Sequence, residues 1–188
     1  MKQFSKFFAV CALSACATAF VACSDDGENF TGDDPVTKVT TPVVEYGFSV
    51  TDDVLAVADL VVTYMNVGGV EATDTLTTGE WELTFTPTSS QKVGFKVTAA
   101  PKAGIDSLLT KDRYTLGSGY HYLSYQRDSQ GKTSELEGSV ANPDENDITI
   151  AADQVKDFFN GKATTVCKSR SAYYDKDKNE FTEWEFTY

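Results

Sequence analysis

The chain has 188 residues, of which 41% are hydrophobic and 23% are charged, a composition that is ordinary for one globular domain with extra segments. Acidic residues outnumber basic ones 28 to 16, so the formal net charge at pH 7 is −12. So acidic a surface repels phosphate backbones, which argues against nucleic acid as a partner. The solubility of a secreted domain explains the acidity more simply.

The first 22 residues have the three-part layout of a secretory signal. Lys2 and Lys6 form a short positive start, and residues 7–22 are an apolar run without a charge. Small residues lead into Cys23, after which the sequence turns acidic. A transmembrane helix would need about 20 apolar residues, so this run is short for one.

This N-terminal segment resembles a bacterial lipoprotein signal, in which a cysteine is lipidated and the signal is cut just before it. The resemblance implies anchoring to the outer membrane through several acyl chains, on its periplasmic or its cell-surface face. Leu13-Ser14-Ala15-Cys16 fits the usual lipobox better, but the apolar run continues past Cys16. Cys23 is therefore the predicted lipidation site and Cys16 the alternative. The start Cys23-Ser24-Asp25-Asp26 resembles surface-exported lipoproteins of the Bacteroidota.

Residues 24–42 are polar, contain two prolines and cannot bury a core. We expect a lipid-anchored flexible tether over 23–42 and a folded domain over 43–188. A first strand is predicted over 43–50, because apolar residues alternate there with polar or small ones. Residues 51–53 are expected to form a turn, and residues 54–58 to lead into the next strand.

The stretch 58–102 predicts four successive strands. Residues 60–65 have apolar side chains at both odd and even positions, and therefore on both faces of the strand. This favours a central place in a sheet. The segment 66–69 contains two glycines and is expected to turn tightly into a Thr-rich edge strand over 70–77.

The third and fourth of these strands show a clear period of two. The third places its large apolar side chains on one face: Trp81, Leu83 and Phe85. In the fourth, residues 93, 95, 97 and 99 are expected to face the core, and Lys92, Gly94, Lys96 and Thr98 to face solvent. Residues 87–90 are expected to join the two strands as a hairpin.

The second half of the chain continues with short elements. A helical turn is expected over 103–110 and a strand over 113–127, broken at 117–119. Weak or short strands are expected over 135–140 and 148–150. A helix should follow with Asp153 as its N-cap and Gly161 at its end. Residues 162–174 and 181–188 should form a closing hairpin around 175–179.

Seven to nine short strands with turns between them predict an all-β protein, an antiparallel β-sandwich of the immunoglobulin-like type with one short helix. A barrel of the lipocalin type is the alternative. The arrangement resembles small β-sandwich lipoproteins of the Bacteroidota, which implies an architecture and no particular activity. Cys167 is the one cysteine in the body of the chain and is expected to be a small buried hydrophobe in a strand.

The aromatic residues are the best clue to binding. Tyr120, Tyr122 and Tyr125, with Tyr173 and Tyr174, could present rings that stack on sugars or on partner side chains. Alternation along the strands should turn about half of them toward the core. His121, the only histidine, is expected to be a strand residue beside these tyrosines.

Two acidic motifs are weighed as catalytic or metal-binding candidates. Glu80-Trp81-Glu82 and Glu183-Trp184-Glu185 invite a glycosidase interpretation through Glu82 or Glu185, but a strand with Trp inward and Glu outward explains them better. Asp175, Asp177 and Asn179 begin like a calcium loop. Glu180 stands where that loop needs glycine and Phe186 where it needs glutamate, so a charged hairpin tip is favoured and no metal or cofactor is predicted.

The sequence therefore predicts a non-enzymatic cell-envelope lipoprotein whose β-sandwich contacts a glycan or a protein partner. A glycan-active enzyme and a structural, pilus-like envelope component are the alternatives. The latter would use strand addition between subunits.

Overall fold

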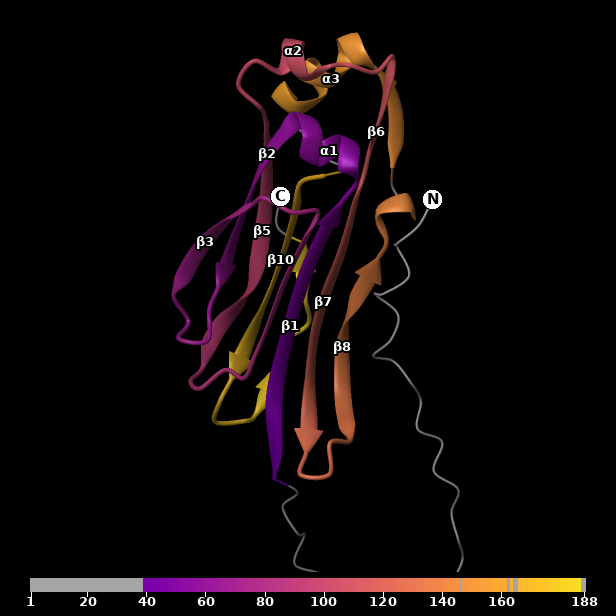
Figure 1. Cartoon of the computed structure of the whole chain (residues 1–188). Coiled ribbons are helices and arrows are strands. Elements are labelled where there is room, and N and C mark those ends of the chain that lie inside the picture. Colours follow the sequence, from indigo (N-terminus) through magenta and orange to yellow (C-terminus); the bar gives the residue numbers. More distant parts are fainter. Residues whose placement is uncertain (1–38, 146, 162, 164–165, 187–188) are drawn as a thin grey trace, which may run out of the picture. The chain divides into compact units, whose positions relative to one another are not determined.

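The computed structural model describes residues 39–145, 147–161, 163 and 166–186 (Figure 1). They belong to one compact unit, Lys38–Tyr188. The predicted signal peptide, both candidate lipidation sites Cys16 and Cys23, and most of the predicted tether lie outside the described residues. Among the residues that are described, no helix is long and apolar enough to cross a membrane.

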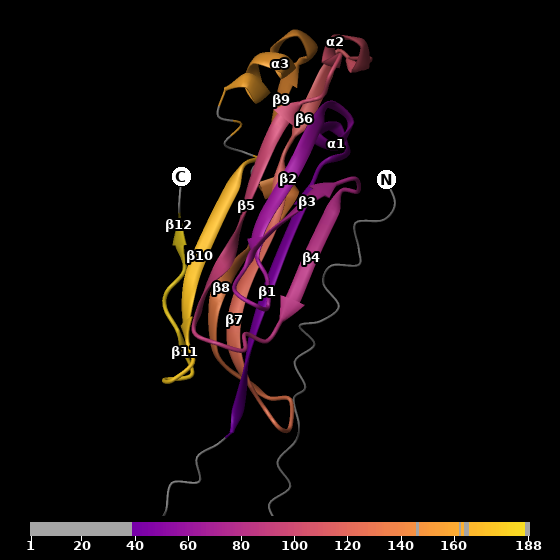
Figure 2. The same cartoon turned by 90° about the vertical axis from the view of Figure 1, so that its left-hand side faces the viewer.

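Two antiparallel sheets form the body of the domain (Figures 1 and 2). Sheet A has the order β4 (Glu80–Phe85), β1 (Thr40–Val50), β7 (Ser118–Asp128) and β8 (Thr133–Ala141). Sheet B has the order β11 (Glu180–Phe181), β10 (Lys168–Asp175), β5 (Gln91–Pro101), β2 (Ala58–Met65) and β3 (Glu71–Leu76), and β12 (Glu185–Phe186) also pairs with β10. This is the predicted all-β, antiparallel sandwich-like architecture.

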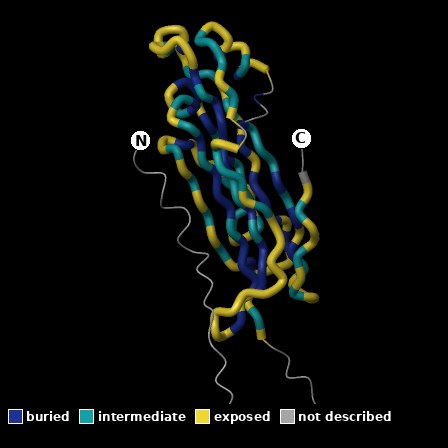
Figure 3. Tube along the Cα trace, turned by 90° about the vertical axis from the view of Figure 1, so that its right-hand side faces the viewer, coloured by how far each residue is buried: buried dark blue, intermediate teal, exposed yellow. Residues whose placement is uncertain are grey.

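The core lies between the two sheets. Inward residues of β1 and β5 alternate with outward ones, as their sequences predict, and all of these inward residues are buried: Val44, Tyr46, Phe48, Val50, Val93, Phe95 and Val97. They pack with Leu60 and Val62 of β2 in one hydrophobic cluster. Figure 3 shows the buried stretches along the middle of the domain and exposed ones at its turns.

Helices gather at one end of the sandwich (Figure 1). They are α1 (Asp52–Val57), α2 (Ile105–Leu108) and α3 (Ala152–Asn160), accompanied by the 3₁₀ turn η1 (Pro143–Glu145) and a small sheet of β6 (Arg113–Leu116) and β9 (Ile148–Ala151). The prediction of one short helix was thus wrong. Helix α1 was taken for a turn and a strand lead-in, but Val54 and Val57 lie one helical turn apart and both are buried.

The predicted hairpin between the third and fourth strands of 58–102 was also wrong. Strand β4 pairs with β1 in sheet A, whereas β5 pairs with β2 and β10 in sheet B. Residues 86–90 therefore cross from one sheet to the other. Alternation fixes which face of a strand is apolar, and it says nothing about which strand lies beside it.

Several boundaries differ from their predictions. Strand β1 begins at Thr40, inside the predicted tether, and the 113–127 strand divides at Gly117 into β6 and β7, which belong to different sheets. Helix α3 has Ala151 as its N-cap, so Asp153 lies in the first turn. Its negative charge there interacts favourably with the positive end of the helix dipole. Cys167 is half-buried and precedes β10 rather than lying in it. The tight turn at 66–69 and the edge position of β3 are confirmed.

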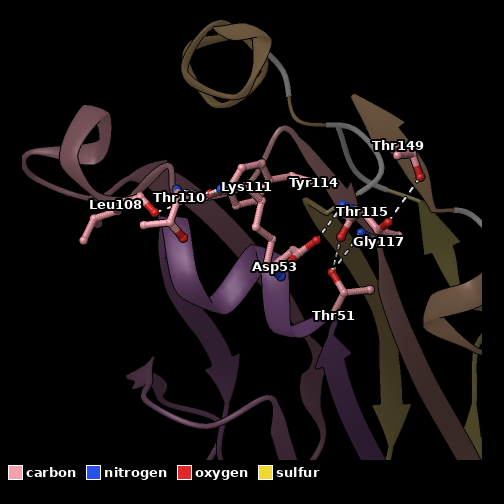
Figure 4. Close-up of polar contacts among 9 residues, drawn as sticks. All are labelled: Thr51, Asp53, Leu108, Thr110, Lys111, Tyr114, Thr115, Gly117 and Thr149. Atoms are coloured by element: carbon pink, nitrogen blue, oxygen red, sulfur yellow. Dashed lines mark hydrogen bonds and ion pairs between the residues drawn. The ribbon is translucent and has the colours of Figure 1, made fainter. Parts of the chain in front are cut away.

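A dense polar network links α1 to β6 and to the loop before β6, within the helical end (Figure 4). The Asp53 carboxylate accepts a hydrogen bond from the Thr115 amide at 2.7 Å and pairs with Lys111. The Tyr114 hydroxyl accepts a hydrogen bond from the Thr110 amide at 2.7 Å. The Thr51 hydroxyl donates to the Thr115 carbonyl at 2.7 Å. These groups satisfy one another, so the network is a structural link.

Candidate functional site

A groove of about 290 Å³ lies on the outer face of sheet B. It extends over β10, β5, β2 and β3, which follow one another in that order in the sheet (Figure 2). Most of its lining residues face outward from these strands: Thr63, Met65, Glu71, Lys92, Gly94, Lys96, Ser169 and Ser171. The other three, Tyr64, Phe95 and Arg170, occupy the inward positions between them. We call this the Gly94 groove.

Strand register builds the groove. Because Val93 and Phe95 point into the core, their neighbours on β5 point outward. Lys96 lies between Thr63 of β2 and Ser169 of β10, and Gly94 lies beside Ser171. The floor at Gly94 is buried, the serine and threonine walls are half-buried, and the two lysines at the rim are exposed.

Gly94 is required where it stands. Its φ is +145°, and a Cβ atom there would lie 2.3 Å from the Arg170 carbonyl oxygen and 2.8 Å from the Ser171 Cα atom. Its amide donates a hydrogen bond to the Tyr46 hydroxyl at 2.5 Å, across the core from sheet A. Burial raises the pKa of Tyr46 above its ordinary value, so the hydroxyl stays neutral. The floor of the groove is thus tied to the centre of the sandwich.

The groove is positively charged on a negatively charged protein. Lys92 and Lys96 flank Gly94, and Glu71 is the single acidic residue in the lining. Within the described part of the chain, no carboxylate lies within ion-pair distance of either lysine ammonium. These two charges are available to a ligand.

An exposed aromatic ring stands beside the groove. Tyr173 is paired with Lys92 in the ladder of β10 and β5, and it lies on the same face as Ser169 and Ser171. Its side chain is 45% exposed, whereas Tyr174, on the opposite face, is buried. Tyr173 is therefore the one of these two predicted aromatic residues that a ligand on this face would meet.

Tyr120 and Tyr122 lie on the inner face of sheet A. Their rings stack with centroids 5.9 Å apart and planes 9° apart. The Arg170 guanidinium lies 4.9 Å from the Tyr120 ring and 5.3 Å from the Tyr122 ring, and Lys168 lies 5.7 Å from Tyr120. Tyr122 is buried and Tyr120 half-buried, so this cluster packs between the sheets.

Tyr125 lies on the other face of the same strand and is 4% exposed. Its hydroxyl donates a hydrogen bond to Glu45 and accepts one from Arg127. Burial, reinforced by the Glu45 carboxylate, raises the pKa of Tyr125 to about 12. The structure therefore brings Tyr120 and Tyr122 together and separates Tyr125 from them.

The first acidic motif has the strand geometry that the sequence favours, whereas Glu183 and Trp184 of the second lie in the segment between β11 and β12. Glu82 and Glu185 are exposed on strands of different sheets, β4 and β12. The tryptophans between the acids point inward: Trp81 packs on Tyr64 at 5.1 Å, and the Trp184 indole donates to the Ser124 hydroxyl at 3.0 Å.

The 175–179 segment is the tip of the β10–β11 hairpin. Asp175 accepts hydrogen bonds from the Asp177 amide at 3.0 Å and the Lys178 amide at 3.3 Å, and its other oxygen pairs with Lys178. Asn179 is turned toward Tyr174, Thr40 and Gln126. Over the ranges that the structure describes, no three His, Cys, Asp or Glu side chains are grouped so that they could hold a metal ion.

His121 lies against β1 on the outer face of sheet A. A Cβ atom at Gly47 would lie 2.0 Å from the imidazole Cε1, so the ring covers the glycine. Burial lowers the pKa of His121, and the carboxylates of Glu82 and Glu45 oppose that shift. The neutral imidazole is therefore favoured in the folded state.

This shift predicts a pH effect on stability. Because the folded pKa lies below the unfolded value of about 6.5, the unfolded chain binds more protons between the two values. Stability from this group is present above about pH 6.5 and is lost as the pH falls. We expect the urea midpoint to drop less between about pH 7.5 and about pH 5.5 in His121→Gln than in the unmodified chain. Equal drops would show that His121 does not contribute.

Comparison with known proteins adds no relative. No protein-family model matches this chain, and neither does any curated protein or solved structure. The groove is therefore interpreted from its own chemistry.

Proposed function

We propose that this chain is a non-enzymatic cell-envelope lipoprotein whose β-sandwich binds a glycan or a protein partner through the Gly94 groove. The groove carries the binding part of this proposal: a hollow of about 290 Å³ on an acidic domain, with two lysine ammoniums that have no ion-pair partner among the residues that the structure describes. Its residues stand on β-strands, which hold a binding site more firmly than loops do. Hydroxyl walls and a nearby tyrosine ring add hydrogen-bonding and stacking groups.

Within this proposal the domain is an immunoglobulin-like sandwich. Two antiparallel sheets with crossing connections such as 86–90 support that type. An outer sheet face of such a domain is broad enough to carry a groove without interrupting the core.

The test is a glycan array probed with soluble residues 24–188, with and without calcium. Selective binding that is abolished by Ser169→Trp, which fills the groove from its wall, would support the proposal. Thr133→Trp, at an exposed position of β8, is the matched control and should bind normally. Selective binding that survives Ser169→Trp would move the site elsewhere.

The anchor is tested separately. We expect Cys23→Ser to release the protein from the membrane fraction, because a chain without acyl groups loses the buried methylenes that hold it there. Cell fractionation and immunoblotting measure the change. Cys16→Ser is the control and should leave the protein in the membrane fraction. If Cys16→Ser alone releases it, Cys16 is the lipidation site.

A further inference from the structure

We propose that the ligand of the Gly94 groove is an anionic saccharide whose sugar units carry carboxylate groups. This inference rests on the proposed function and specifies its ligand. The groove combines groups that suit such a molecule: cations for the carboxylates, hydroxyls for the sugar hydroxyls, and an aromatic ring for a sugar face.

The two cations are spaced for more than one anionic group. Lys92 and Lys96 are four residues apart on one strand and point to the same side. Their Cα atoms are therefore separated by roughly 13 Å, from a rise of about 3.3 Å per residue. That distance exceeds the width of one sugar ring, so two carboxylates on a short chain can each meet one lysine.

The region between the lysines is shaped for the body of the chain. Gly94 places no side chain on the floor of the groove, where the backbones of β5 and β10 approach each other closely. Thr63 and Ser169 offer hydroxyls from the two walls, and Met65 adds an apolar surface. Beside Lys92, on the neighbouring strand β10, the exposed ring of Tyr173 lies on the same face and can stack on a further sugar unit.

Charge favours a compact anion over an acidic protein. The chain carries a net charge of −12, and Glu71 lies in the groove lining itself, so a large acidic partner would be repelled outside the groove. At physiological salt, charges more than about 8 Å apart are largely screened. A slender oligosaccharide seated between the lysines therefore experiences mainly their attraction.

The experiment is calorimetric titration of the full chain in detergent with three probes: trigalacturonate, an uncharged galactose trimer and a short polyglutamate. We expect trigalacturonate to bind and the other two to bind at least tenfold more weakly. Lys92→Gln combined with Lys96→Gln should weaken trigalacturonate binding at least tenfold, since it removes two charge-assisted hydrogen bonds. Lys132→Gln, at an exposed position in the β7–β8 turn, is the matched control and should have no effect.

Each other outcome overturns the inference, and the outcomes separate it from the proposed function. If the neutral trimer binds as tightly as trigalacturonate, and the lysine substitutions weaken neither, the groove binds glycans without selecting for charge. Preferential binding of polyglutamate would assign the groove to an acidic protein segment. Binding of none of the three overturns the anionic-saccharide assignment, whereas glycan binding through the groove is lost only if the glycan array also shows no groove-dependent binding. All variants lie on the surface, and equal thermal midpoints would confirm that they fold.

Discussion

Gly94→Ala is expected to lower the free energy of unfolding by about 3 kcal/mol or more. The added Cβ atom would lie 2.3 Å from the Arg170 carbonyl oxygen, which belongs to the backbone of the neighbouring strand and cannot rotate away. The φ of +145° adds strain for any residue with a side chain. Strands β5 and β10 would have to separate, and urea denaturation would report the loss.

Gly131→Ala is the matched control for Gly94→Ala. Gly131 also has a positive φ, +81°, but nothing lies within 4 Å of the position of its Cβ atom. Backbone strain alone should therefore cost roughly 1 kcal/mol there. Equal losses for the two variants would mean that conformational strain, and not the close approach of β10, makes Gly94 necessary.

Tyr46→Phe is expected to destabilise the domain by about 1–3 kcal/mol, because it leaves the buried Gly94 amide without its acceptor. The ring contacts should persist, since Phe85, Phe95 and Trp184 surround the ring at centroid distances of 5.7, 5.8 and 6.1 Å. The change therefore isolates one hydrogen bond between the sheets. Urea denaturation of both proteins measures its contribution.

Tyr173→Phe is the control, because its hydroxyl belongs to a 45% exposed side chain and should contribute little. A pH series adds a second measure. Burial raises the pKa of Tyr46, so its stabilisation is present below the ordinary tyrosine value of about 10 and is lost as the pH rises further. Tyr46→Phe should show a smaller alkaline decline than the unmodified chain, because the part due to Tyr46 is removed while Tyr125 still contributes. A variant as stable as the unmodified chain would show that solvent or another group satisfies the Gly94 amide.

The faces of the strands could be predicted from the sequence, and their partners could not. The alternation in β4 and β5 places Trp81 and Phe95 inward, as the structure confirms. The same alternation is compatible with a hairpin between these strands or with their separation into two sheets. Helix α1 was missed because its six residues show only one pair of buried positions, Val54 and Val57.

The site was partly visible in the sequence. Lys92, Gly94 and Lys96 alternate with core residues and are predicted to form one row on the outer face of the strand. The glycine interrupts this row of side chains between the two lysines. The two walls of the groove could not be predicted, because Thr63 and Ser169 come from strands that are distant from β5 along the chain. The tyrosines show the same limit. Alternation along the strand places Tyr125 on the opposite face from Tyr120 and Tyr122. Only the order of the strands in the two sheets shows which of these faces packs against the other sheet.

The most direct test of the Gly94 groove as the binding surface is amide chemical-shift mapping of the isotope-labelled chain during titration with trigalacturonate. We predict that the largest shift changes fall on Thr63, on residues 92–96 and on residues 169–171, with Tyr173 next. Changes concentrated on the outer face of sheet A, around His121 and the exposed Leu136, would contradict this account and place the binding surface on the opposite sheet.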